Sequence, residues 1–199
     1  MVTALLLFAL IASLPAQAAA AKSSAPLKIV AFGDSLTSGQ RLPNKDAYPS
    51  VLQAKLRAAG LPFTVVNAGV SGDTTTRALR RLDSALAEQP QILILELGVN
   101  DGLRGVPVPQ VRGNLEKIIE AAKAQDIQVV LCAMEALPLQ GWQYTIDFHR
   151  MYDGLAAKYD VPLIPFLMNG VLQNSDEFRK AFGCRVGTPM APVRECRVW

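Results

Sequence analysis

The sequence predicts an α/β domain of three layers, in which a parallel β-sheet of five strands lies between two layers of helices. Short apolar runs rich in β-branched residues alternate along the chain with longer segments of helical spacing. This alternation is typical of βαβ units with right-handed crossovers, which place helices on both faces of one sheet. The run from Ile92 to Leu97 is almost entirely apolar and is bounded by Pro90 and Gly98, as expected for a central strand covered on both faces.

Each of the five expected strands ends where small or polar residues begin. The strands are expected at residues 29–32, 63–67, 92–97, 128–133 and 163–166. Between them, helices are expected at residues 48–59, after Thr74, around the apolar stripe of residues 111–122, and at residues 146–159.

The helix after Thr74 is expected to bury only one face. Its apolar residues recur at helical spacing, and Asp73 or Thr74 is placed to cap its first turn. The residues between the apolar positions are expected to point largely to water; they are Arg77, Arg80, Arg81 and Asp83.

Length and composition favour one globular domain, expected over residues 26–178. Half of the 199 residues are hydrophobic and 19% are charged. The net charge is +3 with the basic residues scattered, so nothing indicates binding of nucleic acid. The composition is compatible with binding of small neutral or apolar ligands.

The first 21 residues are interpreted as a secretory signal peptide. Residues 5–12 form an apolar core too short to span a bilayer comfortably, and residues 16–20 offer a small-x-small cleavage pattern. The segment has no Lys or Arg, which leaves an uncleaved anchor as the alternative. Cleavage predicts a periplasmic or secreted protein without a stable membrane span. In that oxidising compartment Cys184 and Cys196 could pair, with Cys132 buried in a strand.

The last segment, residues 179–199, breaks the pattern of the domain. It has neither helical nor strand periodicity, and it holds two prolines, two glycines and four arginines. This composition predicts an irregular, atypical tail.

Three predicted strands end in loops that carry groups suited to acyl transfer. Ser35 follows the first strand, Gly72 the second and Asn100 the third. The carboxyl ends of parallel strands share one edge of a sheet, where ligands bind. Acyl transfer needs a nucleophile and donors aimed at the developing oxyanion, and the backbone N–H groups of Ser35 and Gly72 and the Asn100 carboxamide are suitable donors. Each loop alone could be an ordinary turn. The inference of an acyl-transfer site rests on the occurrence of all three loops at one edge of the sheet.

The residues of these loops resemble a known family, the SGNH or GDSL hydrolases, and within it the bacterial periplasmic thioesterase I/lysophospholipase L1 and arylesterase group. The resemblance covers about residues 28–175 and lies in Gly33-Asp34-Ser35-Leu36-Thr37-Ser38-Gly39, in residues 67–74, in residues 96–105 and in residues 159–166.

The resemblance implies a flavodoxin-like sheet and a serine hydrolase. Ser35 would be the nucleophile, and the Ser35 N–H, the Gly72 N–H and the Asn100 Nδ2 would form the oxyanion hole. Carboxylic esters, acyl thioesters and lysolipids would be the substrates, with no metal or cofactor. Residues 137–144, which include Trp142, match a region that borders the acyl-binding groove in relatives; a plain apolar cover is the alternative reading of that loop.

One element of the family pattern is missing from this chain. In the family an Asp-x-x-His pair after the fifth strand supplies the base for the serine. At the corresponding spacing this chain has Ala181 and Cys184, and neither could serve in that relay. Either the chain is shifted in frame or truncated past about residue 178, or it is a variant that has lost the base. The only histidine, His149, is expected at a half-buried boundary of its helix without a catalytic part.

Two functions follow from the sequence. The first is an exported serine esterase or thioesterase with weak or absent turnover. The second is a non-catalytic acyl- or lipid-binding module on the same fold. A nucleotide-binding flavodoxin-like protein is disfavoured, because no G-x-G-x-x-G loop follows the first strand.

Overall fold

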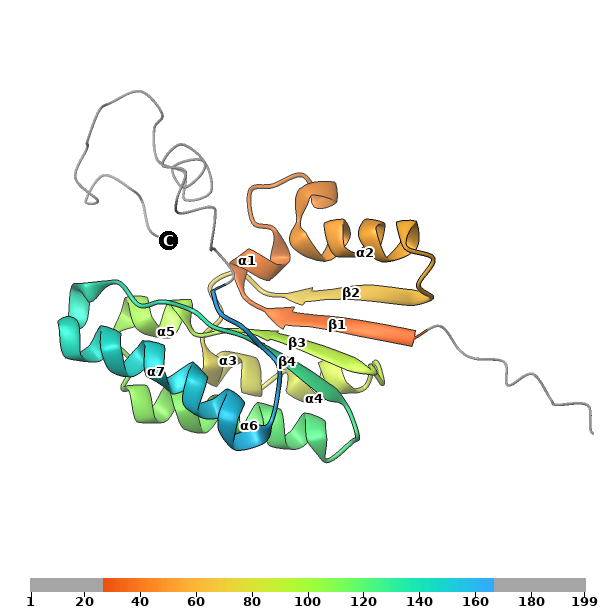
Figure 1. Ribbon diagram of the computed structural model, residues 1–199. Coiled ribbons are helices and arrows are strands. Elements are labelled where there is room, and N and C mark those ends of the chain that lie inside the picture. Colours follow the sequence, from red (N-terminus) through yellow and green to blue (C-terminus); the bar gives the residue numbers. More distant parts are fainter. Residues whose placement is uncertain (1–26, 167–199) are drawn as a thin grey trace, which may run out of the picture.

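A computed structural model describes residues 27–166 as one parallel sheet between helices (Figure 1). The five strands pair in the order β2-β1-β3-β4-β5. Every pair is parallel, with the bounds β1 Leu27–Gly33, β2 Phe63–Gly69, β3 Ile92–Glu96, β4 Gln128–Cys132 and β5 Leu163–Ile164. The predicted fold class and strand count are confirmed.

The helices lie on both faces of the sheet. Figure 1 shows α2 above the sheet, and α3, α4, α6 and α7 below it. This division follows from the strand order, because right-handed crossovers that move in opposite directions along a sheet lie on opposite faces. The bounds are α1 Ser35–Ser38, α2 Tyr48–Ala58, α3 Thr75–Leu79, α4 Leu82–Leu86, α5 Val99–Arg104, α6 Val108–Lys123 and α7 Trp142–Tyr159, with short 3-10 turns at η1 Asn44–Asp46 and η2 Pro138–Gln140.

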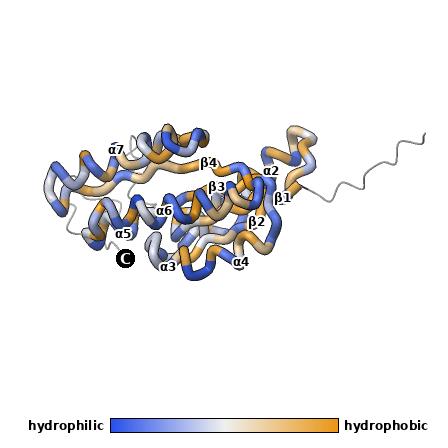
Figure 2. Tube along the Cα trace, turned by 90° about the horizontal axis from the view of Figure 1, so that it is seen from below, coloured by the Kyte–Doolittle hydropathy of each residue, from blue (hydrophilic) through white to orange (hydrophobic). Residues whose placement is uncertain are grey.

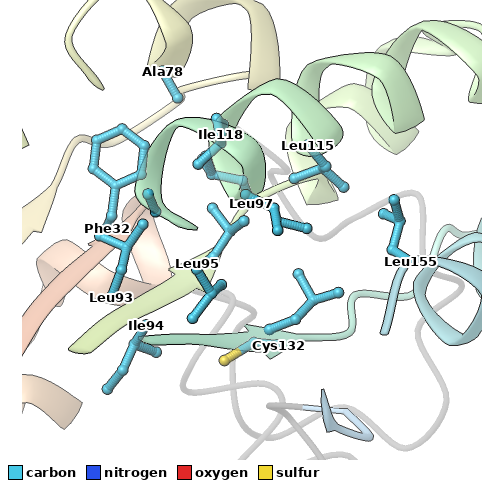
Figure 3. Close-up of a cluster of buried hydrophobic side chains, with 14 of the residues drawn as sticks. Phe32, Ala78, Leu93, Ile94, Leu95, Leu97, Leu115, Ile118, Cys132 and Leu155 are labelled. Atoms are coloured by element: carbon cyan, nitrogen blue, oxygen red, sulfur yellow. The ribbon is translucent and has the colours of Figure 1, made fainter. Parts of the chain in front are cut away.

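The hydrophobic core fills the space between the sheet and the lower helices. In Figure 3, Leu93, Leu95 and Leu97 point toward Leu115 and Ile118 of α6, and all five are fully buried. Ile94 and Cys132 point to the other side of the sheet in the same view, as the alternation of a strand requires. In Figure 2 the strands β3 and β4 are mostly hydrophobic, whereas hydrophobic and hydrophilic residues alternate along the helices. The burial of Cys132 in a strand is therefore confirmed.

Three helical segments differ from the sequence expectation. The helix expected after Thr74 is two short helices, α3 and α4, although Thr74 caps the first through a bond from the Arg77 N–H as predicted. Helix α7 begins at Trp142, four residues before the expected start, directly after Gly141, whose φ of +91° and ψ of 159° are not helical. The expected loop after β3 contains a short helix, α5, which carries Asn100.

Gly98 joins β3 to α5 in a conformation that only glycine adopts readily. Its φ is +127°, and an added Cβ would lie 2.1 Å from the Tyr152 hydroxyl, which donates a hydrogen bond to the Leu97 carbonyl. We expect Gly98→Ala to lower the free energy of unfolding by roughly 1–3 kcal/mol, because it adds overpacking to backbone strain. Urea unfolding followed by circular dichroism measures this, with Gly113→Ala as the control, since a Cβ at Gly113 in α6 meets nothing within 4 Å. An equal loss in both variants would contradict the steric explanation.

No helix within residues 27–166 is long and apolar enough to cross a membrane. The expected signal peptide, the tail at residues 179–199, and Cys184 and Cys196 lie outside the described residues.

Candidate active site

The carboxyl ends of β1, β2 and β3 lie level with one another and bring the three predicted loops together. Gly33 at the end of β1 pairs with Gly69 of β2 on one side and with Glu96 of β3 on the other. The loops that follow are joined directly: Val70 N–H donates to the Gly33 carbonyl at 3.0 Å, and the hydroxyls of Ser38 and Ser71 lie 3.0 Å apart. The structure therefore gathers the loops that carry Ser35, Gly72 and Asn100.

Ser35 is the first residue of α1, at the tip of β1. The preceding Asp34 caps this helix through its Oδ1, which accepts a hydrogen bond from the Leu36 N–H at 3.0 Å. Ser35 is half-buried, and within residues 27–166 neither its N–H nor its Oγ has a hydrogen-bond partner. Both groups are thus available to a bound molecule.

Gly72 lies in the loop between β2 and α3 with its backbone N–H unused by the described part of the chain. Its φ is +77°, a conformation that favours glycine, and a Cβ there would meet nothing within 4 Å. The Arg104 side chain of α5 donates to the Gly72 carbonyl at 3.3 Å and so links this loop to the segment that holds Asn100.

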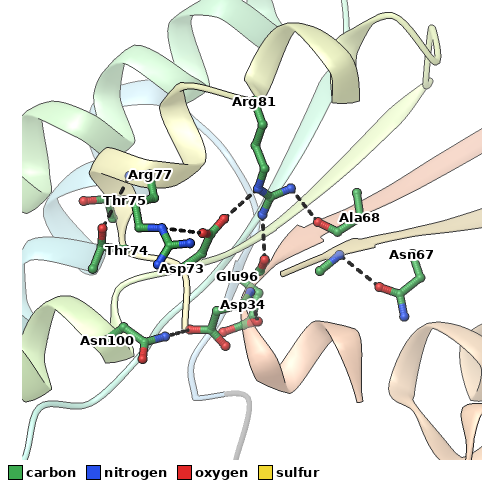
Figure 4. Close-up of polar contacts among 12 residues, drawn as sticks. Asp34, Asn67, Ala68, Asp73, Thr74, Thr75, Arg77, Arg81, Glu96 and Asn100 are labelled. Atoms are coloured by element: carbon green, nitrogen blue, oxygen red, sulfur yellow. Dashed lines mark hydrogen bonds and ion pairs between the residues drawn. The ribbon is translucent and has the colours of Figure 1, made fainter. Parts of the chain in front are cut away.

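Asn100 is buried in the first turn of α5 and is oriented by Asp34. Its Nδ2 donates to Asp34 Oδ2 at 3.0 Å (Figure 4). A carboxamide nitrogen carries two hydrogens, so one remains for a ligand. Asp34 therefore touches two parts of the predicted site, since one oxygen caps the helix of Ser35 and the other holds the Asn100 side chain.

Behind Asp34 lies a second buried carboxyl, Glu96, at the end of β3. Its Oε2 accepts hydrogen bonds from the Thr37 hydroxyl at 2.6 Å and from the Asp34 N–H at 3.2 Å. Its Oε1 has no partner among the described residues. Burial, and next the repulsion from Asp34, raises the pKa of Glu96 well above its usual value. Burial also raises the pKa of Asp34 to about 6.

Sequence reasoning missed the role of Glu96. The available signal was a carboxylate inside an almost continuous apolar run, at residues 92–97. A charged residue at a position that must be buried points to a functional or tightly bonded group.

Sequence reasoning was wrong about Arg81, which does not point to water. Its side chain is 23% exposed, and its guanidinium contacts Asp73 and two backbone carbonyls (Figure 4). Arg77, Arg80 and Asp83 are exposed as expected.

Within residues 27–166, the contacts of His149 are with two acidic side chains and not with Ser35. Its side chain is 54% exposed, and its Nδ1 lies 2.6 Å from Glu135 Oε1 in the segment after β4. Its other nitrogen lies 4.0 Å from Asp153 on the same helix. Strand β4 is two places from β1, which is roughly 10 Å at about 4.8 Å per strand. The histidine thus has its own acidic partners.

The segment that carries Trp142 presents apolar side chains to solvent. Leu139 is 64% exposed and Trp142 is 72% exposed. These two side chains do not cover the core, whereas Tyr144 of the same segment packs against it.

Comparison with known proteins identifies the group to which this arrangement belongs. The GDSL-like lipase/acylhydrolase family matches residues 31–185, a range that contains all three loops of the site. The chain belongs to this family. The GDSL-like chain has the α/β fold with a five-stranded parallel sheet that its structural neighbours share.

Similar proteins of the GDSL-like family are esterases and thioesterases. An arylesterase of Vibrio mimicus is 37% identical over 153 residues, which is 76% of each chain. The thioesterase 1/protease 1/lysophospholipase L1 of Escherichia coli (strain K12) is 36% identical over 75% of this chain and 71% of that protein. Among solved structures, the SGNH-hydrolase family esterase AlinE4 matches with a TM-score of 0.75 and 36% identity over 86% of this chain and 89% of that one.

Proposed function

We propose that this protein is a serine hydrolase that cleaves carboxylic esters or acyl thioesters through an acyl-enzyme on Ser35. The observation that supports the proposal is that the loops of Ser35, Gly72 and Asn100 lie at one edge of the sheet, where the Ser35 hydroxyl and the N–H groups of Ser35 and Gly72 are unused within residues 27–166 and Asp34 orients the Asn100 carboxamide. Membership of the GDSL-like family and the esterase and thioesterase relatives support the same chemistry.

The reaction begins with attack by Ser35 Oγ on the carbonyl carbon of the substrate. The carbonyl π electrons move onto oxygen, and the oxyanion accepts hydrogen bonds from the Ser35 N–H, the Gly72 N–H and Asn100 Nδ2. Collapse expels the alcohol or thiol, which takes up, through water, the proton that Ser35 Oγ has lost, and leaves an acyl group on Ser35. Water then attacks this acyl group and releases the carboxylic acid.

Removal of the serine proton is the step that limits this chain. The sole histidine of the sequence, His149, is held by Glu135 and Asp153 rather than by Ser35. Where a serine lacks its histidine, roughly 10³- to 10⁴-fold acceleration over water remains from the oxyanion hole and binding. We therefore propose weak turnover at an intact oxyanion hole.

The second candidate function is an acyl- or lipid-binding module without turnover. The separation of His149 from Ser35 favours it, and so does the exposure of Leu139 and Trp142, which offer apolar contact to an acyl chain. The two functions differ in whether the Ser35 hydroxyl is reactive.

A fluorophosphonate probe separates the two functions. We expect the probe to label the full chain at Ser35, because its phosphoryl oxygen takes the place of the oxyanion, and Ser35→Ala to abolish the label. Hydrolysis of p-nitrophenyl acetate and of a short acyl thioester is measured beside it, with Ser38→Ala as the control for loss of a neighbouring hydroxyl. Fatty-acid binding without any label at Ser35 would support the binding module. Rapid turnover abolished by Ser35→Ala would show that a base is present.

A further inference from the structure

Because the helix is broken between α3 and α4, the side chain of Arg81 points into the protein. Helix α3 ends at Leu79 and α4 begins at Leu82, and Arg81 between them has φ −117° and ψ 9°, outside helical geometry. In an unbroken helix with the same apolar stripe, Arg81 would lie on the outer face. The break instead directs its side chain toward the carboxyl ends of β1 and β2 (Figure 4).

The Arg81 guanidinium uses all three of its nitrogens there. Its Nε donates to Asp73 Oδ2 at 2.6 Å, Nη1 donates to the Ala68 carbonyl at 2.8 Å, and Nη2 donates to the Gly33 carbonyl at 2.8 Å. Its central carbon lies 4.3 Å from the centre of the Phe32 ring. One planar group thus joins the end of β1, the end of β2 and the loop that follows β2.

Each of these acceptors lies within a few residues of a proposed oxyanion donor. The Gly33 carbonyl begins the backbone that leads through Asp34 to the Ser35 N–H, and it also accepts the Val70 N–H at 3.0 Å. Asp73 directly follows Gly72, and its own N–H donates to the Val70 carbonyl at 3.1 Å. The guanidinium therefore connects the two loops whose backbone N–H groups must point at one oxygen atom.

We propose that Arg81 is a positioning residue that sets the Gly72 N–H against the Ser35 N–H; the inference rests on the proposed function. A purely structural ion pair would need only the Asp73 carboxylate. Here two of the three bonds go to main-chain carbonyls at neighbouring strand ends, and the rigid fork of arginine fixes the distance between them. A lysine has one nitrogen and cannot hold three acceptors in that geometry.

The test compares Arg81→Lys with Arg77→Lys in the full chain. Arg77 contacts the same carboxylate, Asp73 Oδ1 at 3.4 Å, but is 57% exposed and touches neither strand end, so it is the matched control. Two readouts are taken well below the unfolding temperature. Amide hydrogen exchange of Val70 and Asp73 reports the joined loops without any chemistry, and the rate of fluorophosphonate labelling reports the oxyanion geometry.

We expect Arg81→Lys to speed exchange at Val70 and Asp73 by about tenfold or more, while core amides of β3 keep their rates. Labelling of Ser35 should slow by between about 10- and 100-fold without weaker substrate binding, as KM for p-nitrophenyl acetate shows. Arg77→Lys should change each readout by less than about twofold. Asp73→Asn, which leaves both carbonyl bonds in place, should have an effect between the two, and it serves if Arg81→Lys does not fold.

Two results would overturn the inference. In one, exchange at Val70 and Asp73 and the labelling rate stay within twofold of the unchanged protein. In the other, all slowly exchanging amides accelerate together, which marks a contribution to global stability alone. If the unchanged protein is not labelled at all, the proposed function fails, while the exchange data still decide whether Arg81 holds the two loops.

Discussion

Asn100→Leu is expected to slow fluorophosphonate labelling of Ser35, and any ester turnover, by about 100- to 1000-fold. Loss of one oxyanion donor has an effect of this size, roughly 3–4 kcal/mol in the transition state. Leucine has the same number of side-chain heavy atoms as asparagine and branches at the same carbon, so it fills the buried place in α5 while the donor is lost. The rate of label uptake under excess probe measures the effect.

The matched control for this prediction is Asn114→Leu. Asn114 is also buried, but its Nδ2 donates to the Thr75 and Thr76 hydroxyls rather than into the site. Both variants lose hydrogen bonds in a buried setting and should lose about 1–3 kcal/mol of stability. Only Asn100→Leu should slow the labelling. A similar slowing in both would mean that the donor role of Asn100 is wrong.

Asp34→Asn is expected to stabilise the protein at neutral pH and to slow its chemistry. The pKa of Asp34 is raised from 3.8 to about 6, so the protonated form is favoured in the fold. The contribution of protonated Asp34 to the stability of the fold is full below pH 3.8 and is lost as the pH rises through about 6. At pH 7.5 the buried charge therefore costs roughly 3 kcal/mol, at about 1.4 kcal/mol for each pKa unit, and asparagine removes that cost.

The same substitution disturbs the site because it reverses a hydrogen bond. Asp34 Oδ2 accepts from Asn100 Nδ2, whereas an asparagine that keeps its bond to the Leu36 N–H would present a nitrogen there. The Asn100 carboxamide must then turn, and its donor leaves the site. We expect labelling to slow by at least about tenfold at pH 7.5.

Urea unfolding at pH 4 and pH 7.5 checks the stability part of this prediction. The increase in the free energy of unfolding caused by Asp34→Asn should be near zero at pH 4 and largest at pH 7.5. Asp46→Asn, at an exposed carboxyl, controls for the loss of one negative charge. A gain that does not vary between the two pH values would show that burial of the Asp34 charge is not its source. Glu96 remains in both proteins, but repulsion from Asp34 helps to raise its pKa, so Asp34→Asn also relieves the Glu96 carboxyl and the measured gain includes that relief.

The sequence pattern was sufficient for the sheet but not for the side chains behind the site. Apolar runs and helical stripes reflect burial, and so the five strands could be predicted, whereas a flavodoxin-like arrangement of them was implied only by the family resemblance. The break before Arg81 could not, because Arg80 and Arg81 are ordinary helix residues and the inward turn depends on carbonyls distant in sequence. Likewise, the partner of His149, Glu135, lies outside the helix of the histidine, so the helical pattern does not reveal the contact.

The candidate site was foreseen only as a set of loops. That Ser35, Gly72 and Asn100 would share an edge followed from the parallel sheet. Two hydrogen bonds behind the site could not be predicted: Asn100 donates to Asp34, and the Asp34 N–H donates to Glu96. They depend on side-chain rotamers and on which donors remain free, and the sequence pattern contains neither.

Gly33 and Glu96 are neighbours across β1 and β3, and the absent side chain of the glycine is what makes room for the carboxyl. A Cβ at Gly33 would lie 2.0 Å from the Thr37 hydroxyl and 2.5 Å from Glu96 Oε2. It would also lie 2.6 Å from the Glu96 backbone carbonyl, so smaller side chains at 96 and 37 alone would not make room for it, and position 33 requires glycine as long as β1 and β3 keep their pairing. The loop that carries Ser35 can therefore keep its hydrogen bonds to Glu96 of β3 only because residue 33 has no side chain.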